Sequence, residues 1–489
     1  MNASTHPTNV APDESTEAVP AKTFEDEFLS VDALDGISRA AAERTLQRCL
    51  AEIEEMVREK RWEDVVSLFS PVEEKVPEVA SRGLDMELQL KVAFAMGQLK
   101  RFDDAIQVLQ TCAEREPENY SVNSALGYTA YNSLYAARSR EVFLSGKARQ
   151  DRVELAHRHL RKAQALRPDG VTNFYREGAL FKQIEGKPDE AIPLLERAVL
   201  NWDGLRGEEK ARRHQERKNF VKSLYNLAGA LLQTGKADRA REALDRVLQE
   251  DRESNHLSPL FKYFALGKVL YHLNRFAEAR DALVFALRGA DGPTDFVHEL
   301  LARTYLAMGQ AEQALKVIQQ VPERARRPYY RWTEADVWCA LKDFQRAKRA
   351  LLSSQERDRR SRHKTLIRLA KIEYLLGNFD GSAKCASEAL RFFEEKWGTV
   401  FGDGLFWRAL SLFRLCRREE ALESALNLRR HHPGYPTTFC SRGLMRSHDG
   451  NERADTRDER PPSRCPGRND QLRPDLPEDR EGDHRWPEA

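Results

Sequence analysis

The sequence predicts an all-α protein, in which pairs of antiparallel helices stack into a superhelix. A pattern of small and large apolar residues recurs through the middle of the chain. Its shortest spacing is about 34 residues, a period typical of helical repeats. Glycine, asparagine and proline stand where the helices of such units have to end.

The length of the chain agrees with such an array. The chain has 489 residues, whereas a single hydrophobic core stops growing at roughly 250–300 residues. Length alone therefore indicates several domains or a repeat array, and the recurring pattern favours the array. No stretch approaches the ~20 consecutive apolar residues of a spanning helix, which excludes a polytopic membrane protein.

Each repeat centres on a small residue in its second helix. Around Ala279, Gly267 stands twelve residues before, Phe276 three before and Leu283 four after. Large apolar residues at these spacings share one helical face, and the small residues let the two helices approach closely. The same pattern surrounds Ala105, Ala240, Ala314, Ala347 and Ala421, and looser copies centre on Val65, Ala156, Ala191 and Ser382.

The turns within the units carry a second signal. A residue that tolerates the left-handed conformation is expected to end the first helix, because its backbone can satisfy the last carbonyl groups there. These residues are Gly235, Asn274, Gly309 and Gly377. Pro117, Pro168 and Pro433 end second helices. In one unit the spacing from Gly178 to the central Ala191 exceeds the usual twelve residues by one.

These residues together resemble the tetratricopeptide repeat (TPR) family over roughly residues 50–435, in about ten units. A pentatricopeptide array has a similar period, but the packing of small residues and the proline after the second helix favour the tetratricopeptide pattern. The resemblance implies a right-handed α-solenoid in which the first helix of each pair lines a concave groove.

Charge divides the chain into three segments. Residues 1–36 hold eight acids and one lysine, a net charge of −7, and are predicted to be a disordered acidic lead-in. Residues 436–489 hold ten arginines, twelve acids and no lysine, and are predicted to be a disordered tail rich in Arg, Pro and Asp. The repeat array, residues 37–435, therefore carries +11 although the whole chain carries +2. Basic insertions near 135–152 and 203–222 are interpreted as helix extensions.

Two features predict a cytoplasmic location. The start has no basic segment followed by an apolar run, so no secretory signal is visible. The seven cysteines are scattered, with no pair in a CxxC spacing, which indicates reduced thiols.

No motif for catalysis was found. The sequence lacks a GxxxxGK[ST] phosphate loop, an HExxH zinc pair and a GxSxG nucleophile turn. We therefore expect no enzymatic activity, no cofactor and no metal site.

The resemblance places groove residues six before, three before, one after and four after each small residue of the first helices. Aromatic side chains at such positions offer large contact areas, and lysine or arginine attracts acidic partners. Packing between neighbouring helices is an equally good interpretation of any one of them. The predicted partner-binding residues are Tyr175, Tyr225, Phe261, Phe264, Lys268, Tyr271, Arg303, Tyr329, Trp332, Lys364, Arg368 and Lys371.

Some relatives grip terminal carboxylates of a peptide with a Lys–Asn–Asn clamp. Here Asn226 fits the last position, but Tyr175 and Ala179 occupy the first two. The clamp is incomplete, which argues against that kind of adaptor.

Three functions remain open. The leading hypothesis is a non-enzymatic scaffold that binds a protein or peptide partner, expected to be acidic, and assembles a multiprotein complex. The alternative is an RNA-binding or other nucleic-acid-binding protein. It rests on the basic runs Arg324, Arg326, Arg327, Arg331, Arg357, Arg359, Arg360, Arg362, Lys364 and Arg368. A third possibility is that the acidic lead-in folds back on the groove and blocks it.

Overall fold

The computed structural model describes residues 31–435, apart from residues 289, 291–292, 356–357 and 359. These described residues form helices joined by turns and contain no β-strand, which confirms the all-α fold class. The predicted tail, 436–489, lies outside them, and so does most of the predicted lead-in. Residues 31–36, which the sequence assigns to the lead-in, form the start of the first helix.

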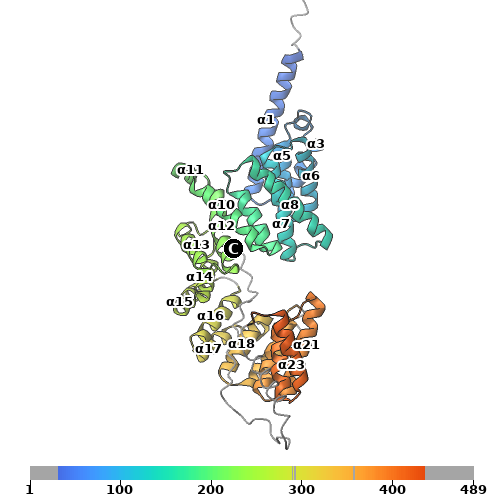
Figure 1. Cartoon of the computed structure of the whole chain (residues 1–489). Coiled ribbons are helices and arrows are strands. Elements are labelled where there is room, and N and C mark those ends of the chain that lie inside the picture. Colours follow the sequence, from blue (N-terminus) through green and yellow to red (C-terminus); the bar gives the residue numbers. More distant parts are fainter. Residues whose placement is uncertain (1–30, 289, 291–292, 356–357, 359, 436–489) are drawn as a thin grey trace, which may run out of the picture. The chain divides into compact units, whose positions relative to one another are not determined.

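The chain divides into two compact units, which are described separately. Unit 1 ends at Leu180 and unit 2 begins at Phe181. The helices of unit 1 are α1 (Val31–Arg58), α2 (Trp62–Phe69), α3 (Val72–Lys75), α4 (Pro77–Ala80), α5 (Met86–Gln98), α6 (Phe102–Arg115), α7 (Tyr120–Arg138), α8 (Gly146–Leu166) and α9 (Thr172–Ala179) (Figure 1).

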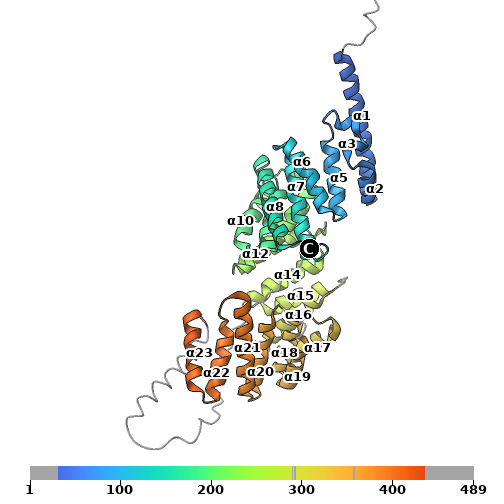
Figure 2. The same ribbon diagram turned by 90° about the vertical axis from the view of Figure 1, so that its right-hand side faces the viewer.

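Unit 2 contains the longer series of helix pairs. Its first four helices are α10 (Pro188–Asp203), α11 (Gly207–Arg212), α12 (His214–Gln233) and α13 (Ala237–Glu250). Next come α14 (Pro259–His272), α15 (Phe276–Leu287), α16 (Asp295–Ala307), α17 (Ala311–Gln320) and α18 (Pro328–Ala340). The last are α19 (Phe344–Gln355), α20 (Arg362–Leu375), α21 (Phe379–Trp397), α22 (Gly402–Arg414) and α23 (Arg418–His431). Successive helices pack against each other, as α20 to α23 do in Figure 2.

Small residues bring the two helices of a pair together, as the repeat pattern predicts. A β-carbon added at Gly267 on α14 would stand 2.6 Å from Leu283 Cγ on α15. A β-carbon at Gly127 on α7 would stand 2.8 Å from Leu160 Cγ on α8. The second helix of each pair therefore packs where the first helix has almost no side chain.

The predicted turn residues adopt the left-handed conformation. The φ angles are 77° at Gly235, 57° at Asn274, 73° at Gly309 and 81° at Gly377. Units without glycine or asparagine use the same backbone conformation at a residue that does not favour it. These residues are Lys100, Lys342 and Cys416, with φ angles of 65°, 61° and 62°.

The overlong step between Gly178 and Ala191 coincides with a π-helix. Residues Leu180–Glu185 form this π-helix, which begins at the last residue of unit 1 and continues into unit 2. A π-turn holds one residue more than an α-turn does. The extra residue is therefore accommodated inside the helix and does not need a longer loop.

The two basic insertions differ in structure. The first lengthens α7 and α8 to 19 and 21 residues, whereas α5 and α6 have 13 and 14. The second forms the separate short helix α11 and the first turns of α12, which has 20 residues. Charged pairs neutralise part of the second insertion, because Arg213 lies 3.1 Å from a carboxylate oxygen of Glu216.

Candidate partner-binding surface

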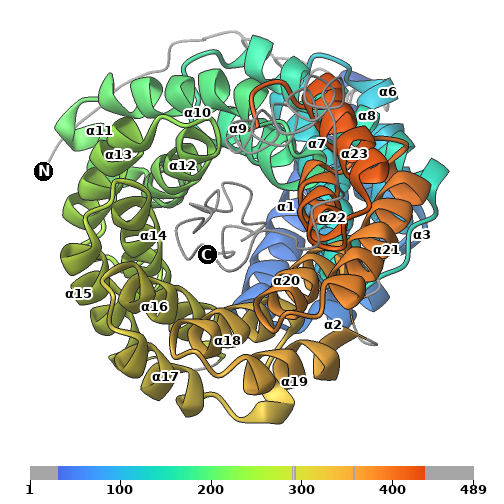
Figure 3. The same ribbon diagram turned by 60° about the horizontal axis from the view of Figure 1, so that its bottom comes forward.

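The first helices of successive pairs form one side of each unit, which we call the first-helix surface. In unit 2 it comprises α12, α14, α16, α18, α20 and α22. Figure 3 shows α12, α14, α16 and α18 on the inner side of this unit, with their partners α13, α15, α17 and α19 outside. In unit 1 the corresponding helices include α5, α7 and α9.

Aromatic rings connect α14 with α16. The rings of Phe261 and Phe296 are stacked with centroids 6.3 Å apart, and Phe264 meets Phe296 edge to face at 4.7 Å. Phe264 is only 3% exposed, so it mainly packs, whereas Phe261 is partly exposed. Phe264 therefore packs between the helices, whereas Phe261 stacks on Phe296 and keeps part of its surface exposed.

Farther along the same helices a cation lies over a ring. The guanidinium carbon of Arg303 stands 5.1 Å from the centroid of the Tyr271 ring. Arg303 also lies 4.0 Å from Glu299, whose carboxylate accepts a hydrogen bond of 2.5 Å from Thr333 on α18. Burial opposes the charge of Arg303, but Glu299, Tyr271 and Asp336 together outweigh it and raise the pKa of Arg303.

Tyr329 connects α18 with α16 through a carboxylate. Its hydroxyl donates a short hydrogen bond to Asp295, and Arg327 lies 3.5 Å from the same carboxylate. Burial and this hydrogen bond raise the pKa of Tyr329, so the phenol keeps its proton at neutral pH.

Trp332 connects α18 with α20. Its Nε1 donates a hydrogen bond of 2.8 Å to Thr365 Oγ1, and the guanidinium of Arg368 lies 5.2 Å from its ring centroid. Lys364 lies 5.9 Å from the same ring, and Arg368 stands 3.6 Å from Asp336. Two of the predicted partner-binding cations, Lys364 and Arg368, thus converge on one indole.

The predicted residues differ in how much surface they offer. Tyr225, Phe264 and Lys268 are buried, with 1%, 3% and 9% of their surface exposed, which leaves little for a partner to contact. The partly exposed ones are Tyr175, Phe261, Tyr271, Arg303, Tyr329, Trp332, Lys364, Arg368 and Lys371.

The one clamp residue that the sequence retains is engaged within unit 2. Asn226 Oδ1 accepts hydrogen bonds from Lys182 Nζ at 3.0 Å and from Gln183 Nε2 at 2.9 Å. Both donors belong to the π-helix. Asn226 thus anchors the π-helix to α12.

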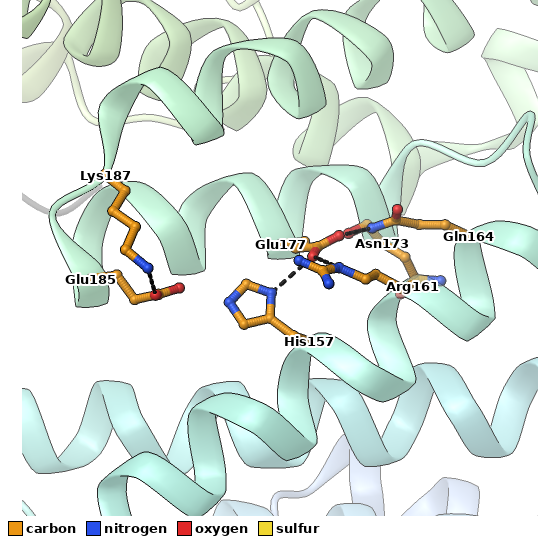
Figure 4. Close-up of polar contacts among 7 residues, drawn as sticks. All are labelled: His157, Arg161, Gln164, Asn173, Glu177, Glu185 and Lys187. Carbon is orange, nitrogen blue, oxygen red and sulfur yellow. Dashed lines mark hydrogen bonds and ion pairs between the residues drawn. The ribbon is translucent and has the colours of Figure 1, made fainter.

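In unit 1 a buried carboxylate fixes α9 against α8 (Figure 4). Glu177, with 2% of its side chain exposed, lies 2.8 Å from His157 Nδ1. It accepts hydrogen bonds from Arg161 Nε at 2.7 Å and Gln164 Nε2 at 2.6 Å. Burial opposes its charge, but the hydrogen bonds from His157 and the other two donors lower the pKa of Glu177 below its usual value.

The same helix carries a cation that the spacing rule passes over. Arg176 stands two residues before Gly178, beside the predicted Tyr175, and its guanidinium carbon lies 4.0 Å from the ring centroid of Tyr128 on α7. Its Nη1 donates to Ser124 Oγ at 3.1 Å. The position two before the small residue is not among the groove positions of the spacing rule, so the rule does not select Arg176.

The basic runs that suggest nucleic-acid binding are partly neutralised. Arg326 and Arg331 both contact Glu334, at 2.8 and 2.7 Å. Arg362 pairs with Glu388. Two further members, Arg357 and Arg359, lie outside the described residues.

Within residues 31–435, as far as the structure describes them, no group of histidine, cysteine and acidic side chains could hold a metal ion. Over the same part of the chain, none of the helices combines the length and apolar character needed to span a bilayer. Among the described cysteines, Cys49, Cys112, Cys339 and Cys385 are free thiols.

Comparison with known proteins identifies the repeat. Residues 184–260 match the sequence model of the tetratricopeptide repeat. Among solved structures, PilF of Pseudomonas aeruginosa is 16% identical, covering 52% of this chain and 99% of its own with a TM-score of 0.39. A tetratricopeptide repeat protein from Parabacteroides merdae is 14% identical, covering 60% and 98% with a TM-score of 0.40. RapI in its apo form is 12% identical, covering 73% and 100% with a TM-score of 0.48. No curated protein matches the chain.

Proposed function

We propose, on the premise that this chain carries tetratricopeptide repeats, that it is a non-enzymatic scaffold that binds an acidic protein or peptide segment on its first-helix surface. Binding of one partner along this surface would leave the second helices free for others, as assembly of a multiprotein complex requires. We place this activity in the cytoplasm.

The observation that carries the proposal is the chain of aromatic and cationic contacts across α14, α16, α18 and α20. Tyr271 with Arg303, and Trp332 with Arg368, each span two successive first helices. All four side chains are partly exposed, so each of the two pairs offers a partner an aromatic ring beside a positive charge. Such pairs suit an extended acidic segment that contains apolar residues.

Charge supports an acidic partner. The repeat array carries +11, and its first helices contribute Lys222, Lys364 and Lys371 to the side where the partner would lie. Burial lowers the pKa of Lys222, with a further contribution from Lys218. An incoming carboxylate would favour the charged form of this lysine and so be bound more tightly.

Protein is favoured over nucleic acid because the basic runs are partly neutralised within the chain. Arg326 and Arg331 share the single carboxylate of Glu334, which compensates one of their two charges. Arg362 pairs with Glu388.

The test is a crosslinking pull-down with the full chain, read by mass spectrometry. Trp332→Ala and Tyr271→Ala should each lose the partners of the unaltered chain. The matched control is Trp397→Ala, which removes an indole that is 44% exposed at the end of the second helix α21. Partner sets that are the same for all three variants would contradict the proposed surface.

A further inference from the structure

We propose that Arg176 and the tyrosines around it, in unit 1, form a site that recognises a single carboxylate of the bound partner. The inference rests on the proposed function and deepens it, because it assigns one chemical group of the acidic segment to one place. The site is built from α7 and α9, two first helices that pack against each other.

The guanidinium of Arg176 is held from two sides. It lies 4.0 Å from the ring centroid of Tyr128 on α7. Its Nη1 donates to Ser124 Oγ at 3.1 Å, and the Ser124 hydroxyl in turn donates to Asn173 Oδ1 at 3.0 Å. The side chain is therefore oriented before any ligand arrives.

Two nitrogens on the other edge of the Arg176 guanidinium have hydrogen-bond donors that are not used within the described structure. All its hydrogen bonds go through Nη1, to Ser124 and Asn173. Neither Nε nor Nη2 bonds to any residue that the structure describes. These two N–H groups form the planar fork that binds both oxygens of a carboxylate.

Other arginines of the first-helix surface that lie over aromatic rings also have a nearby carboxylate, whereas Arg176 has none among the described residues. Arg303 and Arg368 also lie over aromatic rings, and they have Glu299 at 4.0 Å and Asp336 at 3.6 Å. Within the described part of the chain, no carboxylate pairs with Arg176. An arginine stays charged in proteins, and a charge withdrawn from water is costly unless an opposite charge compensates it.

The neutral hydroxyl groups of the surrounding tyrosines favour an anion with a single charge. Tyr120, Tyr128 and Tyr175 are partly exposed beside Arg176, and burial raises the pKa of Tyr175 so that its hydroxyl remains a donor. One guanidinium with neutral donors matches a singly charged carboxylate. A phosphate dianion would be matched better by two cations. Arg167 lies over the Tyr120 ring, with its guanidinium carbon 5.5 Å from the ring centroid, so competition with phosphate is part of the test.

The experiment measures binding of a fluorescein-labelled deca-glutamate peptide to the full chain by anisotropy, at about 50 mM salt. Arg176→Met keeps the length of the side chain and removes the charge. It should weaken binding about 10- to 100-fold, the range expected for a charge-assisted hydrogen bond. Arg158→Met, on the exposed face of α8, removes the same charge elsewhere and should change affinity less than about threefold, as a peripheral charge does.

Each outcome separates the two proposals. If the unaltered chain does not bind deca-glutamate, the acidic-partner function fails. If it binds and Arg176→Met binds equally well, the function stands and the Arg176 site is overturned. Competition by inorganic phosphate at concentrations where acetate has no effect would overturn the assignment to a carboxylate. Circular dichroism melts of both variants ensure that folded proteins are compared.

Discussion

Gly267 and Leu283 lie in contact across the pair α14 and α15, and a β-carbon at Gly267 would stand 2.6 Å from Leu283 Cγ. Gly267→Val should therefore destabilise unit 2 by about 1–3 kcal/mol, the cost of overpacking a closely packed site. Urea unfolding measures this free energy. Gly97→Ala is the control, because nothing lies within 4 Å of a β-carbon there, and it should be neutral or stabilising by up to about 1 kcal/mol.

The left-handed turns predict opposite changes in stability when glycine is removed from one turn and introduced into another. Lys342 has a φ of 61° and Gly235 a φ of 77°. Gly235→Ala should destabilise by about 1–2 kcal/mol, because a β-carbon disfavours the left-handed region. Lys342→Gly removes that cost, but glycine also increases the conformational entropy of the unfolded chain, which favours unfolding. The two effects partly cancel, so stability should rise by no more than about 1 kcal/mol. A thermal melt in which both substitutions destabilise equally would contradict this account of the turns.

The ion pair of Asp85 with Arg115 should make unit 1 sensitive to acid. The two nitrogen–oxygen distances are both 2.7 Å, and Asp85 is 1% exposed. Hydrogen bonds from Arg115 lower the pKa of Asp85 in the folded chain. The ion pair therefore contributes fully to the free energy of unfolding above the unfolded pKa of Asp, about 3.9. This contribution is lost as the pH falls through the lowered folded pKa.

Asp85→Asn should reduce the free energy of unfolding by about 2 kcal/mol at neutral pH, as expected for hydrogen bonds to a charged group. As the pH falls below the unfolded pKa and through the lowered folded pKa, the difference between the variant and the unaltered chain should shrink, because the carboxylate becomes protonated in both states of the latter. Urea unfolding at several pH values measures this difference. A difference that stays constant down to pH 2 would exclude the ion pair as its cause.

Asn226 should stabilise the π-helix. Its Oδ1 accepts from both Lys182 and Gln183, so Asn226→Ala leaves two donors without this acceptor. We expect a loss of about 1–3 kcal/mol and faster amide exchange in residues 180–185. The control Gln233→Ala, at an exposed position on the same helix, should change stability by less than about 0.5 kcal/mol.

Much of the fold could be predicted because it depends on spacing. Gly267 and Asn274 were assigned to close packing and to a left-handed turn from their positions relative to Ala279 alone. The left-handed Lys342 and Cys416 could not be assigned this way, since neither residue type favours the conformation. There, packing of the two helices imposes a turn that the residue itself disfavours.

The surface was less predictable, because one helical position can face either a neighbouring helix or solvent. Tyr225 and Trp332 occupy the same position in their units, three before the small residue, but the first is buried and the second is partly exposed. Arg176 was missed because the value of a cation depends on whether an acid faces it. That property depends on two helices, because α7 lies 38 to 56 residues before Arg176 along the chain.

The most direct test of the central claim is to map crosslinks between the full chain and its bound acidic partner with a lysine-reactive reagent. The first helices present Lys222, Lys364 and Lys371, and the second helices present Lys316 and Lys384. We predict crosslinks concentrated on the first group and suppressed by excess deca-glutamate. Crosslinks confined to Lys316 and Lys384 would contradict binding on the first-helix surface.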